Sequence, residues 1–147
     1  MAGGRVEAIF IGPKRALPEP VERVRAVAGR GLQDNRYFFD QAPPGRALTL
    51  IATEALEAMA AETGIEVTAA ESRRNVLTRG IDLNALVGVR FRVGAVECVG
   101  IELCEPCTTL ESLTKLGVIK GLVHRGGLNA DIETDGEIAV GDDVEPL

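Results

Sequence analysis

Glycine and proline recur along the whole chain and divide its apolar segments into short pieces. The 147 residues include 17 glycines and 7 prolines. Breaks occur at Gly12 and Pro13, at residues 43–45, and at Gly88. Several of the pieces between such breaks alternate apolar and polar residues, which is typical of half-buried β-strands. These frequent glycine and proline breaks therefore favour a fold of short strands over one of long helices.

The expected strands cover residues 5–12, 24–28, 47–52 and two segments of 89–104 that turn near Gly94. Residues 71–80 are expected to form a short strand or an extended loop. The tail is predicted to form a hairpin over 128–139, turned at residues 134–136, followed by a last short strand after Gly141.

Only three segments have the features of helices. The clearest is 53–64, where Thr53 can cap the start and Gly64 can end the helix. Residues 82–88 suggest one helical turn, and 108–117 a second short helix with Thr108 and Glu111 spaced as a capping box. The sequence thus predicts a mainly β, barrel-like fold with two or three short helices over its ends, in one domain spanning 1–147.

The composition of the chain argues against several classes of binding partner. The formal charge of −6 argues against nucleic acid and acidic membranes, because both attract basic surfaces. No segment approaches the roughly 18 apolar residues that cross a bilayer, and the first ten residues lack the pattern of a signal peptide. Three cysteines in a chain of this size fit a reducing cytoplasm, where a close cysteine pair suggests metal binding or catalysis.

Two of the cysteines form the motif LCEPCTTLES, residues 103–112. A zinc site would need two further ligands, for which only Cys98 and His124 are candidates. A thioredoxin-like redox pair would lie between a strand and a helix, but the rest of the chain lacks the alternating strand–helix pattern of that fold. The third interpretation is one reactive thiol, Cys107.

Cys107 directly precedes Thr108, the predicted N-cap of a helix. Backbone N–H groups at such a position favour thiolate over thiol, whereas the charge of Glu105 opposes this effect. Cys104 ends the preceding strand, and we expect it to be a packed side chain or, alternatively, a resolving thiol for Cys107. For Cys98 we expect packing alone.

Four blocks of the sequence together resemble the MOSC domain, a family named for the C-terminal part of molybdenum-cofactor sulfurase. In chain order the blocks are VAGRGLQDNRYF, SRRNVLTRGIDLNALVG, FRVGAVECVGIELCEPCTTL and HRGGLNADIETDGEIAVGDDV. The resemblance extends from about residue 21 to residue 144. It implies a mostly β, barrel-like fold and a characteristic cysteine that follows proline or arginine.

The resemblance also implies roles for individual residues. In family members the cysteine carries a persulfide sulfur or ligates the molybdenum of a bound pterin cofactor, and Pro106–Cys107 matches its motif. The positions that match the family's Arg-Arg-Asn and Gly-rich blocks are Arg73, Arg74, Asn75, His124, Arg125, Gly126 and Gly127. In the earliest block only Arg36 matches, because Asp34, Asn35 and Tyr37 replace the usual glycine, aspartate and histidine.

These residue types suit the chemistry that the resemblance implies. Paired arginines and a glycine-rich turn can hold the phosphate of the pterin cofactor, and a thiolate can accept sulfur or bind a soft metal. Two structural alternatives stay open: Arg73 and Arg74 can mark a solvated strand end, and His124 can be a purely structural histidine.

The leading hypothesis is a sulfur-carrier or molybdenum-cofactor-binding domain that acts through Cys107. A chain of this size lacks the pyridoxal-phosphate half that generates sulfur in the family's larger members, so pyridoxal phosphate is not expected here. It would need a cysteine desulfurase or another sulfur donor, and a molybdenum enzyme or cofactor-biosynthesis protein as acceptor. The alternatives are a non-catalytic cofactor-binding or interaction module and a CxxC thiol–disulfide reductase.

Overall fold

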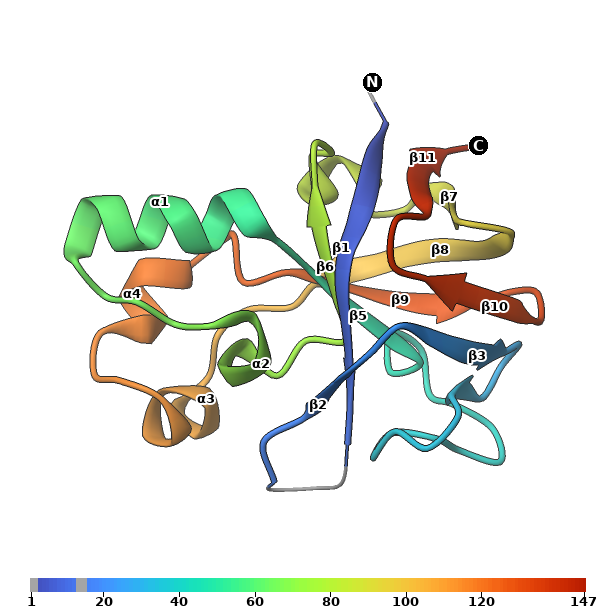
Figure 1. Cartoon of the computed structure of the whole chain (residues 1–147), viewed down its shortest axis with the longest axis horizontal. Coiled ribbons are helices and arrows are strands. Elements are labelled where there is room, and N and C mark those ends of the chain that lie inside the picture. Colours follow the sequence, from blue (N-terminus) through green and yellow to red (C-terminus); the bar gives the residue numbers. More distant parts are fainter. Residues whose placement is uncertain (1–2, 13–15) are drawn as a thin grey trace.

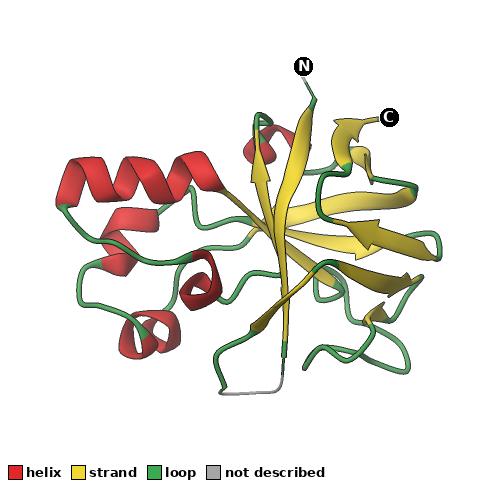
Figure 2. Cartoon of the chain, viewed as in Figure 1, coloured by secondary structure: helices red, strands yellow, loops and turns green. Residues whose placement is uncertain are grey.

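The computed structural model describes residues 3–12 and 16–147 and has a mostly β fold whose four α-helices gather on one side (Figure 1, Figure 2). The strands are β1 (Gly4–Ile11), β2 (Glu19–Val21), β3 (Arg23–Val27), β4 (Gly31–Leu32), β5 (Leu48–Ala52), β6 (Val76–Arg79), β7 (Arg90–Val93), β8 (Val96–Leu103), β9 (Leu128–Ile132), β10 (Gly136–Ala139) and β11 (Asp143–Pro146). The helices are α1 (Thr53–Thr63), α2 (Ala69–Ser72), the 3₁₀ turn η1 (Leu83–Leu86), α3 (Thr108–Leu113) and α4 (Val118–Leu122).

Seven strands close into a barrel in the order β11-β7-β8-β9-β5-β6-β1, and β1 returns to pair with β11. Strand β2 adds to the free side of β1. All of these pairings are antiparallel except that of β5 with β6, which α1 and α2 connect along the chain. The predicted mainly β, barrel-like fold is therefore confirmed.

A separate three-stranded sheet lies beside the barrel in the order β10-β3-β4. Here the prediction of a hairpin over 128–139 is wrong. Strand β9 pairs with β8 and β5, whereas β10 turns away and pairs with β3, over a hundred residues earlier. The turn at residues 134–136 exists, but it redirects the chain from one sheet to the other.

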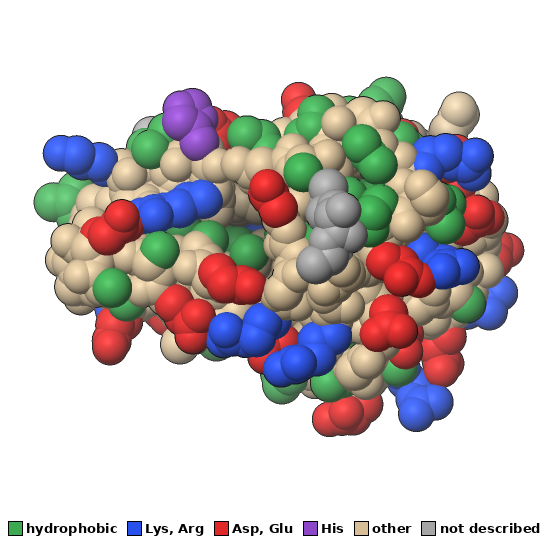
Figure 3. Space-filling model, turned by 90° about the horizontal axis from the view of Figure 1, so that it is seen from above, with side chains coloured by type: hydrophobic (Ala, Val, Ile, Leu, Met, Phe, Trp, Pro, Cys, Tyr) green, Lys and Arg blue, Asp and Glu red, His purple; other side chains and the backbone are tan. Residues whose placement is uncertain are grey.

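The main hydrophobic core fills the barrel, where inward-facing residues of successive strands meet. Phe91 of β7, Leu48 and Leu50 of β5, and Leu128 of β9 are fully buried there. Because alternate residues of each strand point inward, the opposite faces carry polar side chains. Figure 3 shows acidic and basic side chains distributed over one face of the molecule.

A second, smaller core joins the helices to one another beside the barrel. Met59 of α1, Leu110 of α3, and Val118 and Leu122 of α4 are buried in it with Val67. Helix α1 ends at Gly64, as predicted, with the glycine in the left-handed region at φ 76°. The predicted cap Thr53 is wrong: Ala52 is the cap, and the Thr53 hydroxyl instead donates a 2.5 Å hydrogen bond to Glu7.

In the described residues, no helix has the length and apolar composition needed to cross a membrane.

Candidate functional site

A cavity of about 290 Å³ opens where the helices meet the barrel, and both cysteines of the CxxC motif line it. Four arginines line it as well, from three separate parts of the chain. The lining side chains that matter for its chemistry are Arg36, Arg46, Arg73, Arg74, Cys104 and Cys107, and Glu102 is the only acidic lining residue among those that the structure describes.

The loop that carries the two cysteines is held in place by backbone contacts. The Arg74 guanidinium donates hydrogen bonds to the carbonyl oxygens of Cys104 (3.0 Å) and Gly126 (2.8 Å), and to that of Ser72 (3.3 Å). The Cys104 N–H donates to the Gly127 carbonyl at 2.7 Å. A Cβ atom on Gly126 would lie 2.5 Å from the Cys104 carbonyl oxygen, so only glycine allows this approach.

Cys107 itself caps helix α3, which corrects the prediction that Thr108 does so. The Cys107 backbone is extended, and its Sγ accepts a hydrogen bond of 3.5 Å from the Leu110 N–H. Glu111, expected to close a capping box, instead accepts a 2.5 Å hydrogen bond from the Gly117 N–H. The Cys107 residue is exposed and lines the cavity, so its sulfur is accessible to a ligand.

The other two cysteines differ from Cys107 in their environment. Cys104 is partly buried, and desolvation raises the pKa of its thiol, although the positive charge of Arg74 acts in the opposite direction. Cys98 is fully buried, and desolvation raises its pKa to about 12. Both thiols therefore stay protonated near neutral pH, so Cys107 is the accessible sulfur of the site.

The arginines of the cavity have no acidic partners. Within residues 3–12 and 16–147, none of Arg36, Arg46, Arg73 and Arg74 forms a salt bridge. The Arg36 Nη2 donates to the Arg73 carbonyl at 2.9 Å, and partial burial together with the charge of Arg36 lowers the pKa of Arg73. The cavity is therefore a locally positive site in an acidic protein, which favours an anionic ligand.

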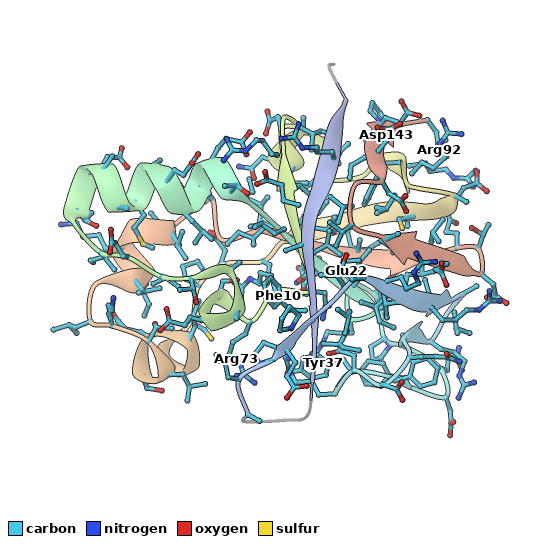
Figure 4. All side chains as sticks on the ribbon, in the orientation of Figure 1. Phe10, Glu22, Tyr37, Arg73, Arg92 and Asp143 are labelled. Carbon is cyan, nitrogen blue, oxygen red and sulfur yellow. The ribbon has the colours of Figure 1, made fainter. Side chains whose placement is uncertain are left out.

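Tyr37 supports two of these arginines. The guanidinium carbons of Arg36 and Arg46 lie 4.9 Å and 5.3 Å from the centre of its ring. Tyr37 and Arg73 lie at the same end of the molecule, from the loop after β4 and from the end of α2 (Figure 4). Cation–π contacts of this kind hold a guanidinium by its face and leave its N–H edge for hydrogen bonds.

Five of the sequence-predicted residues lie outside the cavity lining: Asn75, His124, Arg125, Gly126 and Gly127. Asn75 is buried and holds the backbone together: its Oδ1 accepts from the Thr49 N–H, and its Nδ2 donates to the Phe10 carbonyl. His124 is 77% exposed (Figure 3) and forms a 2.9 Å contact with Glu105. Arg125 forms a salt bridge with Glu62 and lines a second depression instead.

The structure thus brings together Arg36, Arg73, Arg74 and Cys107, with Gly126 and Gly127 behind the cysteine loop. Sequence reasoning missed Arg46, Tyr37 and Cys104 as lining residues. Arg46 follows the Pro-Pro-Gly break, and the local sequence predicts only a loop there. Its contact with Tyr37 depends on tertiary structure. A second, mostly apolar depression of about 550 Å³ lies between α1 and η1.

The described residues contain no group of three or more histidine, cysteine, aspartate or glutamate side chains placed to hold a metal ion. The zinc interpretation of the CxxC motif therefore lacks its further ligands here.

The model of the MOSC domain family matches residues 40–145, which is most of the chain and includes the cysteine loop and three of the four cavity arginines. The chain belongs to the MOSC domain family. This family is associated with molybdenum-cofactor proteins, which agrees with the resemblance found in the sequence. Arg36 and Tyr37 lie outside the matched residues, so the cavity of this MOSC domain is completed by a segment that the family model does not cover.

Solved structures share the fold of this MOSC domain. The YuaD protein from Bacillus subtilis has 15% sequence identity and a TM-score of 0.83, over 99% of this chain and 96% of that one. YiiM from Geobacillus stearothermophilus has 16% identity and a TM-score of 0.78, over 98% and 75%. YiiM from Escherichia coli has 18% identity and a TM-score of 0.71, over 97% and 69%. At these identities the likeness concerns the fold alone. No curated protein matches the sequence.

Proposed function

We propose that this MOSC domain is a sulfur carrier of molybdenum-cofactor metabolism, in which Cys107 accepts a sulfane sulfur and passes it on. The observation that carries the proposal is the single exposed cysteine in a cavity surrounded by four arginines. A persulfide carrier needs an accessible thiolate and a site for the acceptor beside it. The positive cavity supplies that site for an anionic acceptor such as the phosphate-bearing pterin cofactor.

The residues present fit the phosphate end of that cofactor. Within residues 3–12 and 16–147, the buried Arg36 Nη1 has no hydrogen-bond partner, and neither Arg46 nor Arg73 forms a salt bridge. Guanidinium groups bind phosphate oxygens bidentately, and a thiolate is a ligand for a soft metal. The cavity volume of about 290 Å³ is close to the lower end of known ligand pockets, so part of the cofactor would stay outside it.

Within the chain, each residue has a separate task. Arg36, Arg46 and Arg73 would hold the phosphate, while Arg74 fixes the cysteine loop through the three carbonyl groups that it binds. The Leu110 N–H fixes the direction of the Cys107 sulfur. When bound, the cofactor would supply the molybdenum that receives the sulfur from Cys107.

The test is to load the purified protein with a cysteine desulfurase and cysteine, and to locate the added sulfur by mass spectrometry. We expect a mass increase of one sulfur atom on the peptide that contains Cys107, its absence in Cys107→Ser, and its retention in Cys98→Ser. Metal and pterin analysis of protein from a molybdenum-replete host gives the second readout. If Cys107→Ser retains both sulfur uptake and cofactor binding, the assignment is wrong.

Two alternatives predict different results. A CxxC thiol–disulfide reductase needs both cysteines, so Cys104→Ser would abolish activity as fully as Cys107→Ser. The partial burial and raised pKa of Cys104 favour the carrier over the reductase. A non-catalytic cofactor-binding module would bind the pterin in Cys107→Ser as well as in wild type and would never carry a persulfide.

A further inference from the structure

The arginines of the cavity differ from most other arginines of the protein in lacking acidic partners. Seven arginines elsewhere form salt bridges with glutamate or aspartate: Arg5, Arg23, Arg30, Arg79, Arg90, Arg92 and Arg125. None of the four around the cavity does so within the described residues, although the protein has 22 acidic residues. Positive charges kept together without counter-ions are costly, and an anionic ligand would offset that cost.

The hydrogen-bonding capacity of these arginines is also partly unused. In the described part of the chain, the buried Arg36 Nη1 has no hydrogen-bond partner, and the face of the Arg46 guanidinium packs on the Tyr37 ring. Arg74 donates to three backbone carbonyl groups, whereas in the described residues the Arg73 guanidinium donates one hydrogen bond, from Nη1 to the Ala16 carbonyl at 2.8 Å, and Arg36 donates one, from Nη2 to the Arg73 carbonyl. Arg36 and Arg73 thus keep nitrogens that can donate to an oxyanion, and Arg46 is exposed to one.

The volume of the cavity suits a small anion beside the thiol. One water takes up about 30 Å³, so the cavity has room for roughly ten waters. A tetrahedral oxyanion of four or five heavy atoms fits with its hydration, and Cys107 lines the same space. The arrangement places a nucleophilic sulfur next to a site for a sulfonate or sulfate-like group.

We propose that the cavity binds a small oxyanion that carries sulfane sulfur, of the thiosulfate class, and that this anion can donate its outer sulfur directly to Cys107. This inference rests on the proposed carrier function of Cys107 and adds a donor to it. The anion would reach Cys107 without a protein donor, through the arginines that distinguish this cavity.

The transfer balances without any further oxidant or reductant. The Cys107 thiolate attacks the outer sulfur of thiosulfate and forms a new S–S bond. The original S–S bond breaks, and its electron pair leaves with sulfite, so a thiolate and thiosulfate become a Cys107 persulfide anion and sulfite. The leaving sulfite carries two negative charges, which Arg36, Arg46 and Arg73 stabilise.

Glu102 is the acidic residue on the rim of this cavity, and it acts against anion binding. Its replacement by glutamine keeps the size of the side chain and removes the charge. We therefore expect Glu102→Gln to lower the KM for thiosulfate by about threefold, which is the effect of a partly screened charge.

The kinetic experiment uses the full chain with thiosulfate as sulfur donor and cyanide as acceptor, and it measures the products thiocyanate and sulfite. A second measurement, mass spectrometry of the Cys107 peptide, follows incubation with thiosulfate alone. The decisive variant is Arg46→Gln, because the Arg46 side chain is exposed and packs on the Tyr37 ring. We expect it to raise the KM for thiosulfate about tenfold, the effect of one lost charge-assisted hydrogen bond. Arg25→Gln is the matched control, since Arg25 is exposed on β3 and does not line the cavity.

The outcomes separate this inference from the proposed function. A persulfide on Cys107 after thiosulfate, with the KM raised in Arg46→Gln and unchanged in Arg25→Gln, supports it. If a cysteine desulfurase loads Cys107 but thiosulfate does not, the inference is wrong and the carrier function stands. Equal KM values in Arg46→Gln and Arg25→Gln also overturn it, because the sulfur then enters without the cavity. If neither donor loads Cys107, both proposals fail.

Discussion

Cys104 and Cys107 belong to one short motif, yet their surroundings give them different reactivity. Cys107 is exposed at the cavity, Cys104 has a raised pKa because it is desolvated, and the pKa of buried Cys98 is about 12. A higher pKa leaves less thiolate at a given pH, and the thiolate is the form that reacts.

We therefore expect iodoacetamide at pH 7 to modify Cys107 first, Cys104 more slowly, and Cys98 only after unfolding. Peptide mass mapping over a time course gives the order, and the same reaction in urea should label all three at similar rates. Raising the pH toward 9 should speed the labelling of Cys104, because more of its thiol ionises as the pH approaches its pKa. Labelling of Cys104 before Cys107 in the native protein would contradict the assignment.

Arg74 is the residue whose loss should harm stability most among the cavity arginines. It binds three backbone carbonyl groups that no other side chain reaches in the described residues. At about 1 kcal/mol for each hydrogen bond, Arg74→Met should lower the free energy of unfolding by about 3 kcal/mol. Urea denaturation measures this change. Arg46→Met, which removes the same charge, should cost less than about 1 kcal/mol because Arg46 is exposed.

The residues of the site could be found from the sequence only in part. Cys107 has a local signal, a cysteine between proline and a helix start, and Arg73, Arg74 and Arg36 come from the family resemblance. Arg46 and Tyr37 have no local signal, since their proximity depends on the loop of residues 33–47 folding back over the barrel end. Arg74 holds the cysteine loop through three carbonyl groups, whereas Arg73 donates to the Ala16 carbonyl, and this difference also needs coordinates because the two residues are adjacent in sequence.

Among the secondary-structure elements, α3 matters most for the proposed function because Cys107, the proposed sulfur carrier, is its N-cap. Sulfur is a weak hydrogen-bond acceptor, and a serine hydroxyl at the same position is a strong N-cap. Both Cys107→Ser and Cys107→Ala should abolish sulfur uptake, but only the alanine variant loses the hydrogen bond from Leu110.

We expect Cys107→Ser to exceed Cys107→Ala by about 1 kcal/mol in the free energy of unfolding, the usual effect of an N-cap. Denaturation in urea of the two variants, compared with wild type, tests this. The pair also separates chemistry from folding, because the serine variant keeps the helix start. Equal stabilities of the two variants would mean that the cap in the structure contributes nothing.

The elements that could be predicted were those with local signals. Helix α1 has its terminating glycine, and β7 and β8 have a tight turn at Gly94, so both follow from the sequence. Helices α2 and α4 were missed because each has five residues or fewer, and α4 is held by burial of Val118 and Leu122 against Met59. Strand β10 was assigned to the wrong partner, since its pairing with β3 is a long-range contact that alternation of residues cannot reveal.

For the whole molecule, barrel closure is the feature that places the first and last strands together. Strand β11 pairs with both β1 and β7, so it completes the ring, and the start of β1 lies near β11 in Figure 1. The helices sit at the side of this closed barrel and contribute the cysteine and part of the arginine cluster. A rigid barrel and a smaller helical core thus position the two halves of the cavity.

The charge of the whole molecule and the charge of its cavity have opposite signs. The protein is acidic overall, with a formal charge of −6, but its cavity is lined by four arginines that form no salt bridge in the described residues, so anions should bind there. An anion that binds only the folded state stabilises it by RT ln(1 + [L]/Kd), which is about 1.4 kcal/mol at ten times the Kd and roughly 3–6 °C in Tm for a domain of this size.

Sulfate, which has the charge and shape of the proposed donor without a transferable sulfur, should therefore raise the Tm of the wild type by this amount over chloride at equal ionic strength. Sulfate also stabilises proteins in general by exclusion from their surfaces, so the decisive quantity is the difference between variants. Arg46→Gln should lose most of the specific increment, whereas Arg25→Gln, with the same loss of charge, should keep it. An identical sulfate response in the two variants would show that the cavity binds no anion, because general exclusion acts on both alike.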